Sequence, residues 1–251
     1  MLLHATETGQ GPPICLLHGL FGRSQNLGAL ARRWSHTNRV ISLDLRNHGQ
    51  SPHAPVMSYD FMAADVLLTL GQMNALPCRL LGHSMGGKVA MTIALNVPKS
   101  VSGLTVADIA PLSYSHGNQD VAAALLRLKL SPGLTRADAD AALAADIPNK
   151  AVRGFLLQNL VFGPSPHWRI GLAAIEAAIP AIEAWPPTQG QYAGPTLFIR
   201  GGDSDYVPDS AWPSIRALFP AAKLVTIPRG GHWVHADQPA AFAIAAEDQA
   251  T

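Results

Sequence analysis

Short apolar runs alternate along the chain with longer stretches in which apolar residues recur at helical spacing. The short runs predict buried strands, at residues 2–6, 14–18, 40–45, 78–82, 104–108, 196–200 and 223–227. The longer stretches between them predict helices at residues 25–34, 59–76, 85–97, 210–218 and 239–247, with Ser58 as a candidate N-cap of the second helix. Because strands and helices alternate, we expect βαβ units and a mostly parallel sheet.

This alternation stops between residues 112 and 185. Apolar positions there recur at helical spacing in four stretches, at residues 121–130, 136–145, 152–161 and 170–182. Helices inserted between two strands predict a lid over the carboxyl edge of the sheet. We therefore expect a core domain formed by residues 1–111 and 186–251 and a helical cap formed by residues 112–185. The segment Trp185, Pro186 and Pro187 returns the chain to the core.

The junction at residues 80–90, which reads L-L-G-H-S-M-G-G-K-V-A, carries the most specific motif in the chain. Ser84 lies in a G-x-S-x-G pattern between a predicted strand and a predicted helix, as in a nucleophile elbow. Gly82 and Gly86 leave room for the strained turn that lifts the serine hydroxyl clear of the sheet. The amides at the start of the following helix can face an oxyanion. Ser84 is therefore predicted to be a nucleophile.

The same residues also fit most of a phosphate-binding loop. The segment from Gly82 to Lys88 spells G-x-x-x-x-G-K, and residues 104–108 resemble the acidic strand that often accompanies such a loop. Val89, however, stands where the magnesium-binding Ser or Thr is required. A nucleotide-binding protein is therefore the less favoured alternative.

Composition narrows the possible functions. The chain has 251 residues, of which 48% are hydrophobic and 14% charged, and its formal net charge is +1. These values indicate one compact α/β domain with an insertion, and the lack of a basic cluster argues against nucleic acid or an anionic membrane as partner. The ten histidines are scattered, without an H-E-x-x-H or C-x-x-C pair, so we expect no metal.

The two cysteines, Cys15 and Cys78, each stand at the head of an apolar run. Buried free thiols are therefore expected, which fits a reducing cytoplasm. The first four residues lack the basic and long apolar regions of a signal peptide, and no apolar run suits a membrane span. We expect a cytoplasmic protein, and the sequence leaves its oligomeric state open.

A histidine near the end of the chain completes the expected chemistry. The strand at residues 223–227 leads into P-R-G-G-H-W, a glycine-rich loop that can fold back so that His232 reaches the elbow serine as a general base. His235, three residues further on, is the competing candidate. We favour His232, and expect a structural contact for His235.

An oxyanion hole is expected from two backbone amides. The strand at residues 14–18 runs into H-G-L-F-G, a turn that can direct the amide of Leu20 toward the same point as the amide of Met85. His18, at the start of this turn, is expected to order the loop through hydrogen bonds rather than to act as a base.

The acid that should orient the histidine has three candidates. In proteins with a nucleophile elbow, the acid usually stands in a loop of the form G-x-x-D-x-x-V-P after the penultimate strand. Residues 201–208 read G-G-D-S-D-Y-V-P, so Ser204 occupies the position of the acid, with Asp203 and Asp205 on either side. Asp108 ends the preceding predicted strand, at residues 104–108, in mostly apolar surroundings. A buried carboxylate needs a partner, and a histidine Nδ1–H is suitable. We favour Asp108 over Asp203 and Asp205.

Four segments together resemble the α/β-hydrolase superfamily, and specifically its YbfF-type small esterase branch. They are H-G-L-F-G from His18, D-L-R-N-H-G-Q-S from Asp44, residues 82–90, and G-H-W-V-H from Gly231, and the similarity runs from about Pro13 to Pro239. The resemblance implies an α/β-hydrolase fold, with a mostly parallel eight-stranded sheet and a helical cap. It also implies Asp108 as the acid, hydrolysis of short-chain esters or acyl-CoA thioesters, and no metal or organic cofactor.

The predicted protein is thus a serine carboxylesterase or thioesterase that works through Ser84, His232, Asp108 and an acyl-enzyme. Its cap should set substrate size, and the segment 44–51 should support the elbow. A binding protein that kept the fold but lost turnover is the alternative from another functional class. Candidate residues for an apolar acyl pocket are Phe21, Phe155, Phe162, Trp168, Tyr206 and Trp233.

Overall fold

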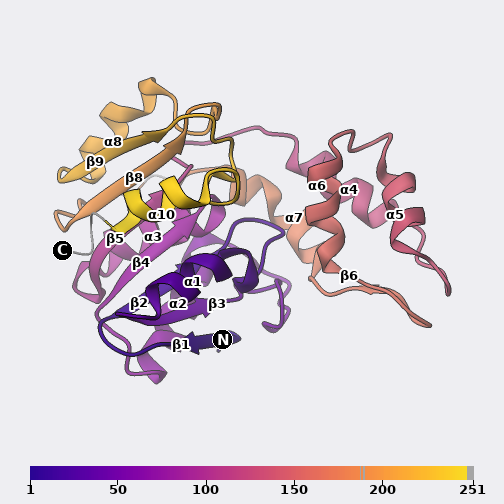
Figure 1. Cartoon of the computed structure of the whole chain (residues 1–251), viewed down its shortest axis with the longest axis horizontal. Helices are drawn as coiled ribbons and strands as arrows, with labels where there is room; N and C mark the ends of the chain where they lie inside the picture. The colour runs from indigo at the N-terminus through magenta and orange to yellow at the C-terminus, as the bar shows by residue number, and fades with distance from the viewer. Residues whose placement is uncertain (187, 189, 248–251) are drawn as a thin grey trace.

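Seven strands form a mostly parallel sheet at the centre of the protein (Figure 1). The computed structural model describes residues 1–186, 188 and 190–247. The strand order is β1-β3-β2-β4-β5-β8-β9, and only the β1–β3 pair is antiparallel among these neighbours. The strands are β1 (Ala5–Thr8), β2 (Pro13–Leu17), β3 (Arg39–Leu43), β4 (Cys78–His83), β5 (Val101–Ala107), β8 (Thr196–Gly201) and β9 (Ala222–Ile227).

The strands of the sheet match the predicted runs, but their number differs from the eight that the family resemblance implied. Each predicted run forms a strand, but the described residues give this sheet seven strands instead of eight. The first strand begins later than predicted, because the amides of Leu3 and His4 donate to the side chains of Thr69 and Ser51. Its pairing with β3 therefore starts at Ala5.

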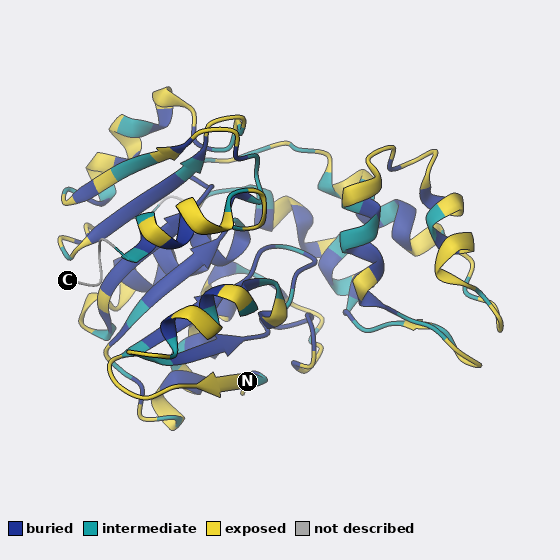
Figure 2. Cartoon of the chain, viewed as in Figure 1, coloured by how far each residue is buried: buried dark blue, intermediate teal, exposed yellow. Residues whose placement is uncertain are grey.

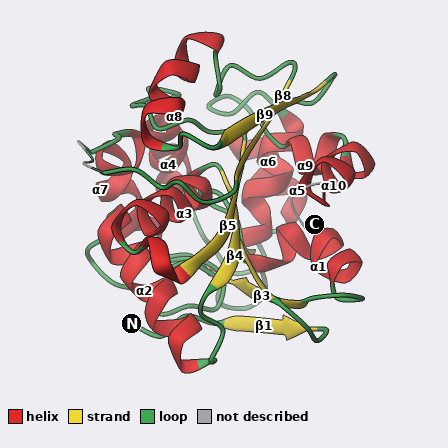
Figure 3. Ribbon diagram, turned by 90° about the vertical axis from the view of Figure 1, so that its left-hand side faces the viewer, coloured by secondary structure: helices red, strands yellow, loops and turns green. Residues whose placement is uncertain are grey.

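Helices cover both faces of the sheet (Figure 3). On one face, α2 (Tyr59–Gln72), α3 (Met85–Asn96) and α8 (Trp212–Leu218) enclose the larger apolar core. On the other, α1 (Gly28–Trp34) and α10 (Pro239–Glu247) enclose a smaller core. The central strands are buried between these layers (Figure 2). The Ser58 hydroxyl accepts a hydrogen bond from the Phe61 amide, which confirms Ser58 as the N-cap of α2.

The order of the strands determines where loops meet. The chain passes from β2 to β3 on one side, and β4 then pairs with β2 on its other side. Loops that follow β2 and β4 therefore leave the carboxyl edge side by side, at the switch point where open α/β sheets bind ligands. These are the loops that carry His18–Gly22 and Ser84 in the sequence.

Residues 112–185, the proposed cap, extend beyond this carboxyl edge (Figure 1). The segment holds four helices, which are α4 (Asn118–Arg127), α5 (Arg136–Leu143), α6 (Lys150–Leu156) and α7 (Leu172–Glu183). Pro187, in the segment that leads back to the core, lies outside the described residues.

The prediction of one helix over residues 152–161 is wrong at its end. Helix α6 stops at Leu156, and after a short 3-10 turn the chain forms a hairpin of β6 (Leu160–Val161) and β7 (His167–Trp168). The turn of this hairpin reads G-P-S-P, and Gly163 has a φ of 130°. Glycine and proline of this kind are turn signals that outweigh the helical spacing before them.

Both cysteines are free and buried, as predicted. Cys15 lies in β2 and Cys78 begins β4. Burial raises the pKa of the Cys78 thiol to about 12 and also raises that of Cys15. Both side chains therefore behave as neutral core residues at physiological pH.

Lys88 connects the helix that follows the elbow to the end of the proposed cap. Its side chain is 1% exposed, and two aromatic rings flank its ammonium group, those of Tyr59 and Tyr114. The Nζ atom donates to three carbonyls at the C-terminal end of α7, those of Ile182 (3.4 Å), Glu183 (3.0 Å) and Ala184 (2.9 Å). The lysine of the phosphate-loop-like pattern thus serves as a cap for orphan carbonyls of another helix.

Replacing Lys88 with methionine should weaken the attachment of α7. The Lys88→Met variant keeps an apolar stem but leaves the three carbonyls without their donor, so we expect a loss of about 2 kcal/mol in the free energy of unfolding. Urea denaturation measures this loss. Lys99→Met is the matched control: Lys99 is exposed, and its replacement should change stability by less than about 0.5 kcal/mol.

The difference in stability between the wild type and Lys88→Met should depend on pH. Burial lowers the pKa of Lys88 to about 7, well below that of a lysine in the unfolded chain. Between pH 7 and about 10 the unfolded chain therefore binds more protons at this residue, and stability rises with pH. The advantage of the wild type over Lys88→Met should thus grow from pH 7 to pH 9 in urea titrations. An advantage that shrinks over this interval would contradict the lowered pKa.

Candidate active site

Ser84 occupies a strained turn between β4 and α3. Its φ is 52°, in the left-handed region that side chains rarely adopt, and its amide donates to the carbonyl of Ala107 on the neighbouring strand (3.0 Å). The glycines on either side permit this turn. A Cβ on Gly82 would lie 2.1 Å from the Gly86 carbonyl oxygen, and a Cβ on Gly86 would lie 2.4 Å from the Leu17 carbonyl oxygen. The elbow therefore requires the G-x-S-x-G pattern.

The structure brings together the three residues favoured from the sequence. Ser84 Oγ lies 3.0 Å from His232 Nε2, and His232 Nδ1 lies 2.8 Å from Asp108 Oδ2. Since a carboxylate can only accept, His232 donates through Nδ1–H, and its Nε2 is left to accept from the serine hydroxyl. This tautomer makes Nε2 available to take a proton from Ser84.

Asp108 is fully buried, and three donors surround its carboxylate. Besides His232, the amide of Gly201 donates to Oδ1 at 2.9 Å, and the hydroxyl of Ser204 donates to Oδ2. Asp108 also has a positive φ, of 50°. Hydrogen bonds from several donors stabilise a buried carboxylate.

Ser204 has a role that its sequence position suggested only indirectly. It stands where the family pattern usually has the acid, and in the structure it donates a hydrogen bond to the acid. Asp203 and Asp205, the competing candidates, are exposed, and neither carboxylate bonds to His232. The sequence marked Ser204 by its place at the usual position of the acid, but no local pattern indicated that its hydroxyl donates to Asp108.

Two further histidines border His232. His83 Nε2 donates to the His232 carbonyl oxygen at 2.8 Å, so it supports the backbone of the His232 loop. The His235 ring packs edge-on against His83, with centroids 4.5 Å apart. Burial lowers the pKa of His235 to about 4 and that of His83 well below its usual value. Both are therefore neutral at pH 7, and of the three histidines only His232 forms a hydrogen bond with the Ser84 hydroxyl.

Leu20 and Met85, whose amides are expected to form the oxyanion hole, both line the cavity beside Ser84. Met85 is the first residue of α3, where an amide has no partner within the helix. Neither amide donates to another residue that the structure describes. Both are therefore available to a ligand.

Hydrogen bonds from two histidines fix the loop that carries Leu20. His18 Nε2 accepts from the Leu45 amide, and His18 Nδ1 donates to the Gly19 carbonyl. His48 Nε2 accepts from the Phe21 amide (3.0 Å). Burial lowers the pKa of His18 and lowers that of His48 to about 3. As expected, His18 orders the loop and remains neutral.

The segment 44–51, expected to support the elbow, supports the Leu20 loop instead. Asp44 accepts from the amides of Ser24 (2.7 Å) and Gln50 (2.8 Å), and His48 holds Phe21. The elbow gains from this only indirectly, through the close approach of Gly86 to the backbone at the end of β2.

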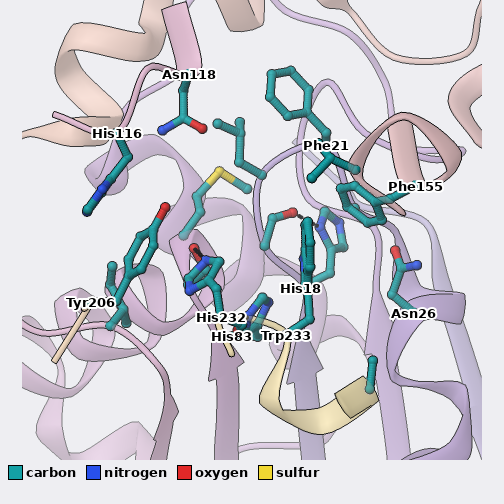
Figure 4. A pocket seen from close by; sticks show the side chains of 18 of the residues that line it. His18, Phe21, Asn26, His83, His116, Asn118, Phe155, Tyr206, His232 and Trp233 are labelled. Carbon is teal, nitrogen blue, oxygen red and sulfur yellow. Dashed lines mark hydrogen bonds between the residues drawn. The ribbon is translucent and has the colours of Figure 1, made fainter. Parts of the chain in front are cut away.

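A cavity of about 620 Å³ opens above these residues (Figure 4). Four of the predicted pocket residues line it, which are Phe21, Phe155, Tyr206 and Trp233. Phe162 and Trp168, the other two candidates, are not among the residues that line this cavity: Phe162 directly follows β6, and Trp168 ends β7. Tyr206 lies on the side of the cavity opposite Phe21 and Phe155 (Figure 4).

Two other properties of the described residues bear on the site. No group of three or more His, Cys, Asp or Glu side chains gathers there as possible metal ligands. None of the described helices has the length and hydropathy needed to cross a membrane.

Comparisons with known proteins agree with one another. The family model for the "alpha/beta hydrolase fold" matches residues 12–239. The sn-1-specific diacylglycerol lipase ABHD11 of Mus musculus is 41% identical, over 92% of this chain and 78% of that protein. Esterase YbfF of Escherichia coli K12 is 37% identical, over 90% of this chain and 88% of that protein. The solved structure of a marine microorganism esterase matches with a TM-score of 0.95 at 36% identity, over 98% of both chains.

Filling the space at the elbow should disturb the fold measurably. In Gly82→Ala the new Cβ meets the Gly86 backbone, so we expect a loss of about 1–3 kcal/mol in the free energy of unfolding. Gly71→Ala is the matched control, since Gly71 lies in helix α2 with open space around it, and alanine there should stabilise by up to about 1 kcal/mol. Urea denaturation of both variants tests the close approach, and equal stability of the two would refute it.

Proposed function

This chain belongs to the α/β-hydrolase family and is an enzyme that hydrolyses esters, and from that premise we propose that it does so through a Ser84–His232–Asp108 triad and an acyl-enzyme. The observation that carries the proposal is the unbroken hydrogen-bonded path from Ser84 Oγ through His232 to Asp108, at the floor of a cavity. This arrangement has the geometry that nucleophilic catalysis by a serine requires.

In the first step, Ser84 Oγ attacks the carbonyl carbon of the ester while His232 Nε2 takes its proton. The buried carboxylate of Asp108 stabilises the imidazolium that forms and keeps the ring in the correct orientation. Ser204 and the Gly201 amide keep Asp108 itself in place. The product of this step is a tetrahedral intermediate with a negatively charged oxygen.

The amides of Leu20 and Met85 stabilise that oxygen. They are preorganised donors, because the loop of Leu20 is held by His48 and the Met85 amide is fixed at the start of α3. The positive end of the helix dipole adds to the effect. Donors aimed at developing charge contribute a large part of the rate enhancement in acyl transfer.

Collapse of the intermediate breaks the bond to the leaving group, which receives the proton from His232 Nε2. A water molecule then attacks the acyl-enzyme, with His232 taking its proton, and the second collapse releases the carboxylic acid. The proton returns to Ser84 Oγ, so the enzyme is regenerated without any other reactant.

The substrates that suit the cavity are carboxylic esters with short to medium acyl chains, and acyl-CoA thioesters as a second class. Phe21, Phe155 and Trp233 supply an apolar surface for the acyl chain. Thioesters follow the same chemical steps with a sulfur leaving group. The free, buried thiols favour a reducing, cytoplasmic location.

The two alternatives are less consistent with the site. An inactive binding protein would not need the hydrogen bond between Ser84 and His232, nor the strained φ of the serine. A nucleotide-binding loop would need its lysine free for phosphate, and Lys88 donates to carbonyls of α7 instead.

A fluorophosphonate probe should label the native enzyme at Ser84. The phosphonyl group resembles the tetrahedral intermediate, so labelling requires both the activated serine and the oxyanion hole. Mass spectrometry of the labelled protein should place one adduct on the peptide with Ser84, and Ser84→Ala should take up none. Absence of labelling in the wild type would contradict the enzymatic mechanism proposed above.

The identity of the acid is tested by three amide variants. Asp108→Asn should lower kcat by about 10³-fold or more, because the carboxamide no longer favours the correct tautomer of His232. Asp203→Asn and Asp205→Asn are matched controls on exposed positions and should keep kcat within about 2-fold of the wild type. Hydrolysis of p-nitrophenyl butyrate gives these values. Near-normal turnover by Asp108→Asn would assign the acid elsewhere.

A further inference from the structure

The cavity above Ser84 has two walls of different chemistry (Figure 4). Phe21, Phe155 and Trp233 form the apolar wall, with the Phe155 and Trp233 ring centroids 5.4 Å apart. On the opposite side, His116, Asn118 and Tyr206 present nitrogen and oxygen atoms; these three residues are called the polar wall below. An acyl pocket alone gives no reason for this second wall.

The polar wall has hydrogen-bonding capacity that the described residues do not use. Asn118 Nδ2 donates to Glu183 Oε1 at 2.9 Å, which fixes the amide and leaves Oδ1 on the cavity side (Figure 4). His116 Nε2 is buried without a partner among the described residues. Tyr206 bonds to other described residues through its backbone, while its hydroxyl bonds to none of them. Buried polar atoms are normally paired, so a ligand is the expected partner of His116 Nε2. The free oxygens of Asn118 and Tyr206 border the same cavity and are available to that ligand.

A stack of rings connects the polar wall to His232. The Tyr206 ring lies over the His232 ring, with centroids 3.6 Å apart and planes 18° from parallel. The His116 ring lies on the Tyr206 ring, with centroids 4.0 Å apart. In the reaction His232 delivers its proton to the leaving group, so the leaving oxygen must lie beside His232. The rest of the leaving group then extends along this stack.

The apolar wall borders the other part of the reacting ester. Phe21 directly follows Leu20, whose amide is expected to hold the carbonyl oxygen, and Phe21 is fixed by its bond to His48. The acyl chain begins at that carbonyl carbon, so it can extend over Phe21 and Phe155. The two halves of an ester therefore meet opposite walls.

The charges near the polar wall select the kind of leaving group. The free atom of Asn118 is an acceptor, and the carboxyl group of Glu183 lies directly behind it. The nearby ammonium group of Lys88 is directed to the carbonyls of α7. An anionic group therefore finds no donor in Asn118, whereas a neutral hydroxyl can donate to Asn118 Oδ1 and accept from the Tyr206 hydroxyl.

From these contacts we infer that the polar wall is a subsite for an alcohol leaving group that carries hydroxyl groups of its own, so that polyol esters are preferred over esters of simple alcohols. The inference rests on the proposed serine esterase function. It assigns Asn118 and Tyr206 to substrate specificity, in addition to the residues that carry out the reaction.

Two esters of butanoic acid test the subsite, since they differ only in their alcohol. The wild type should hydrolyse 2,3-dihydroxypropyl butanoate with a kcat/KM about 10-fold above that for propyl butanoate, the gain expected from one or two additional hydrogen bonds. Tyr206→Phe keeps the ring that stacks on His232 and removes only the hydroxyl. Tyr206→Phe and Asn118→Leu should each reduce the ratio of the two kcat/KM values about 3- to 10-fold.

The matched control is Gln158→Leu, which removes a polar side chain that lines the cavity beside Asn26, away from the polar wall. This variant should keep the wild-type ratio. A wild-type ratio near one, or a ratio that Tyr206→Phe and Asn118→Leu leave unchanged, would overturn the subsite. If Ser84 still reacts with the fluorophosphonate probe in that case, the esterase mechanism stands. If neither ester is hydrolysed and the probe does not react, the mechanism fails as well.

Discussion

The hydrogen bonding of the Asp108 carboxylate is the interaction on which the arrangement of the site depends. A fully buried carboxylate is unfavourable unless donors surround it, and here the donors come from the end of β8, the loop after it and the loop after β9. Meeting this requirement brings together segments that lie 93 to 124 residues from Asp108 in the sequence. The orientation of His232 toward Ser84 follows from it.

Backbone strain gathers around the same point. Phe21, Ser84 and Asp108 all have a positive φ. Ser84 and Asp108 directly follow β4 and β5, and Phe21 lies in the loop after β2. Such conformations cost about 1–3 kcal/mol each and persist only where the surrounding structure holds them. The parallel strands and the buried neutral histidines His18 and His48 provide that support. The strain is thus part of how the reacting groups are kept in place.

The core and the proposed cap depend on each other at the cavity. The proposed triad and oxyanion amides come from loops at the edge of the sheet, whereas Phe155, His116 and Asn118 come from residues 112–185. Lys88 joins the two parts, since it lies one turn after Ser84 in α3 and caps the end of α7. In the proposed mechanism, loops at the edge of the sheet carry the reacting groups, and the inserted helices contribute to substrate choice.

Local signals in the sequence were sufficient for much of the fold. The helix Pro239–Glu247 has the predicted ends, and the strand Cys78–His83 differs from its prediction by one residue. Apolar periodicity and turn residues act within a few positions of one another, so they can be read without knowledge of the rest of the chain. The hairpin at residues 160–168 was missed because its pairing competes with helical spacing that continues into it.

The sequence by itself determined the kind of chemistry, because an elbow serine, a histidine on a glycine-rich loop and an H-G-L turn each have a local pattern. Only the tertiary structure decided the rest. It placed Ser204 as a donor to Asp108, directed the segment 44–51 to the Leu20 loop, left Phe162 out of the cavity lining and set Tyr206 against His232. Each of these contacts joins residues that are far apart in the sequence and meet only in the folded protein. No local sequence pattern therefore predicts them.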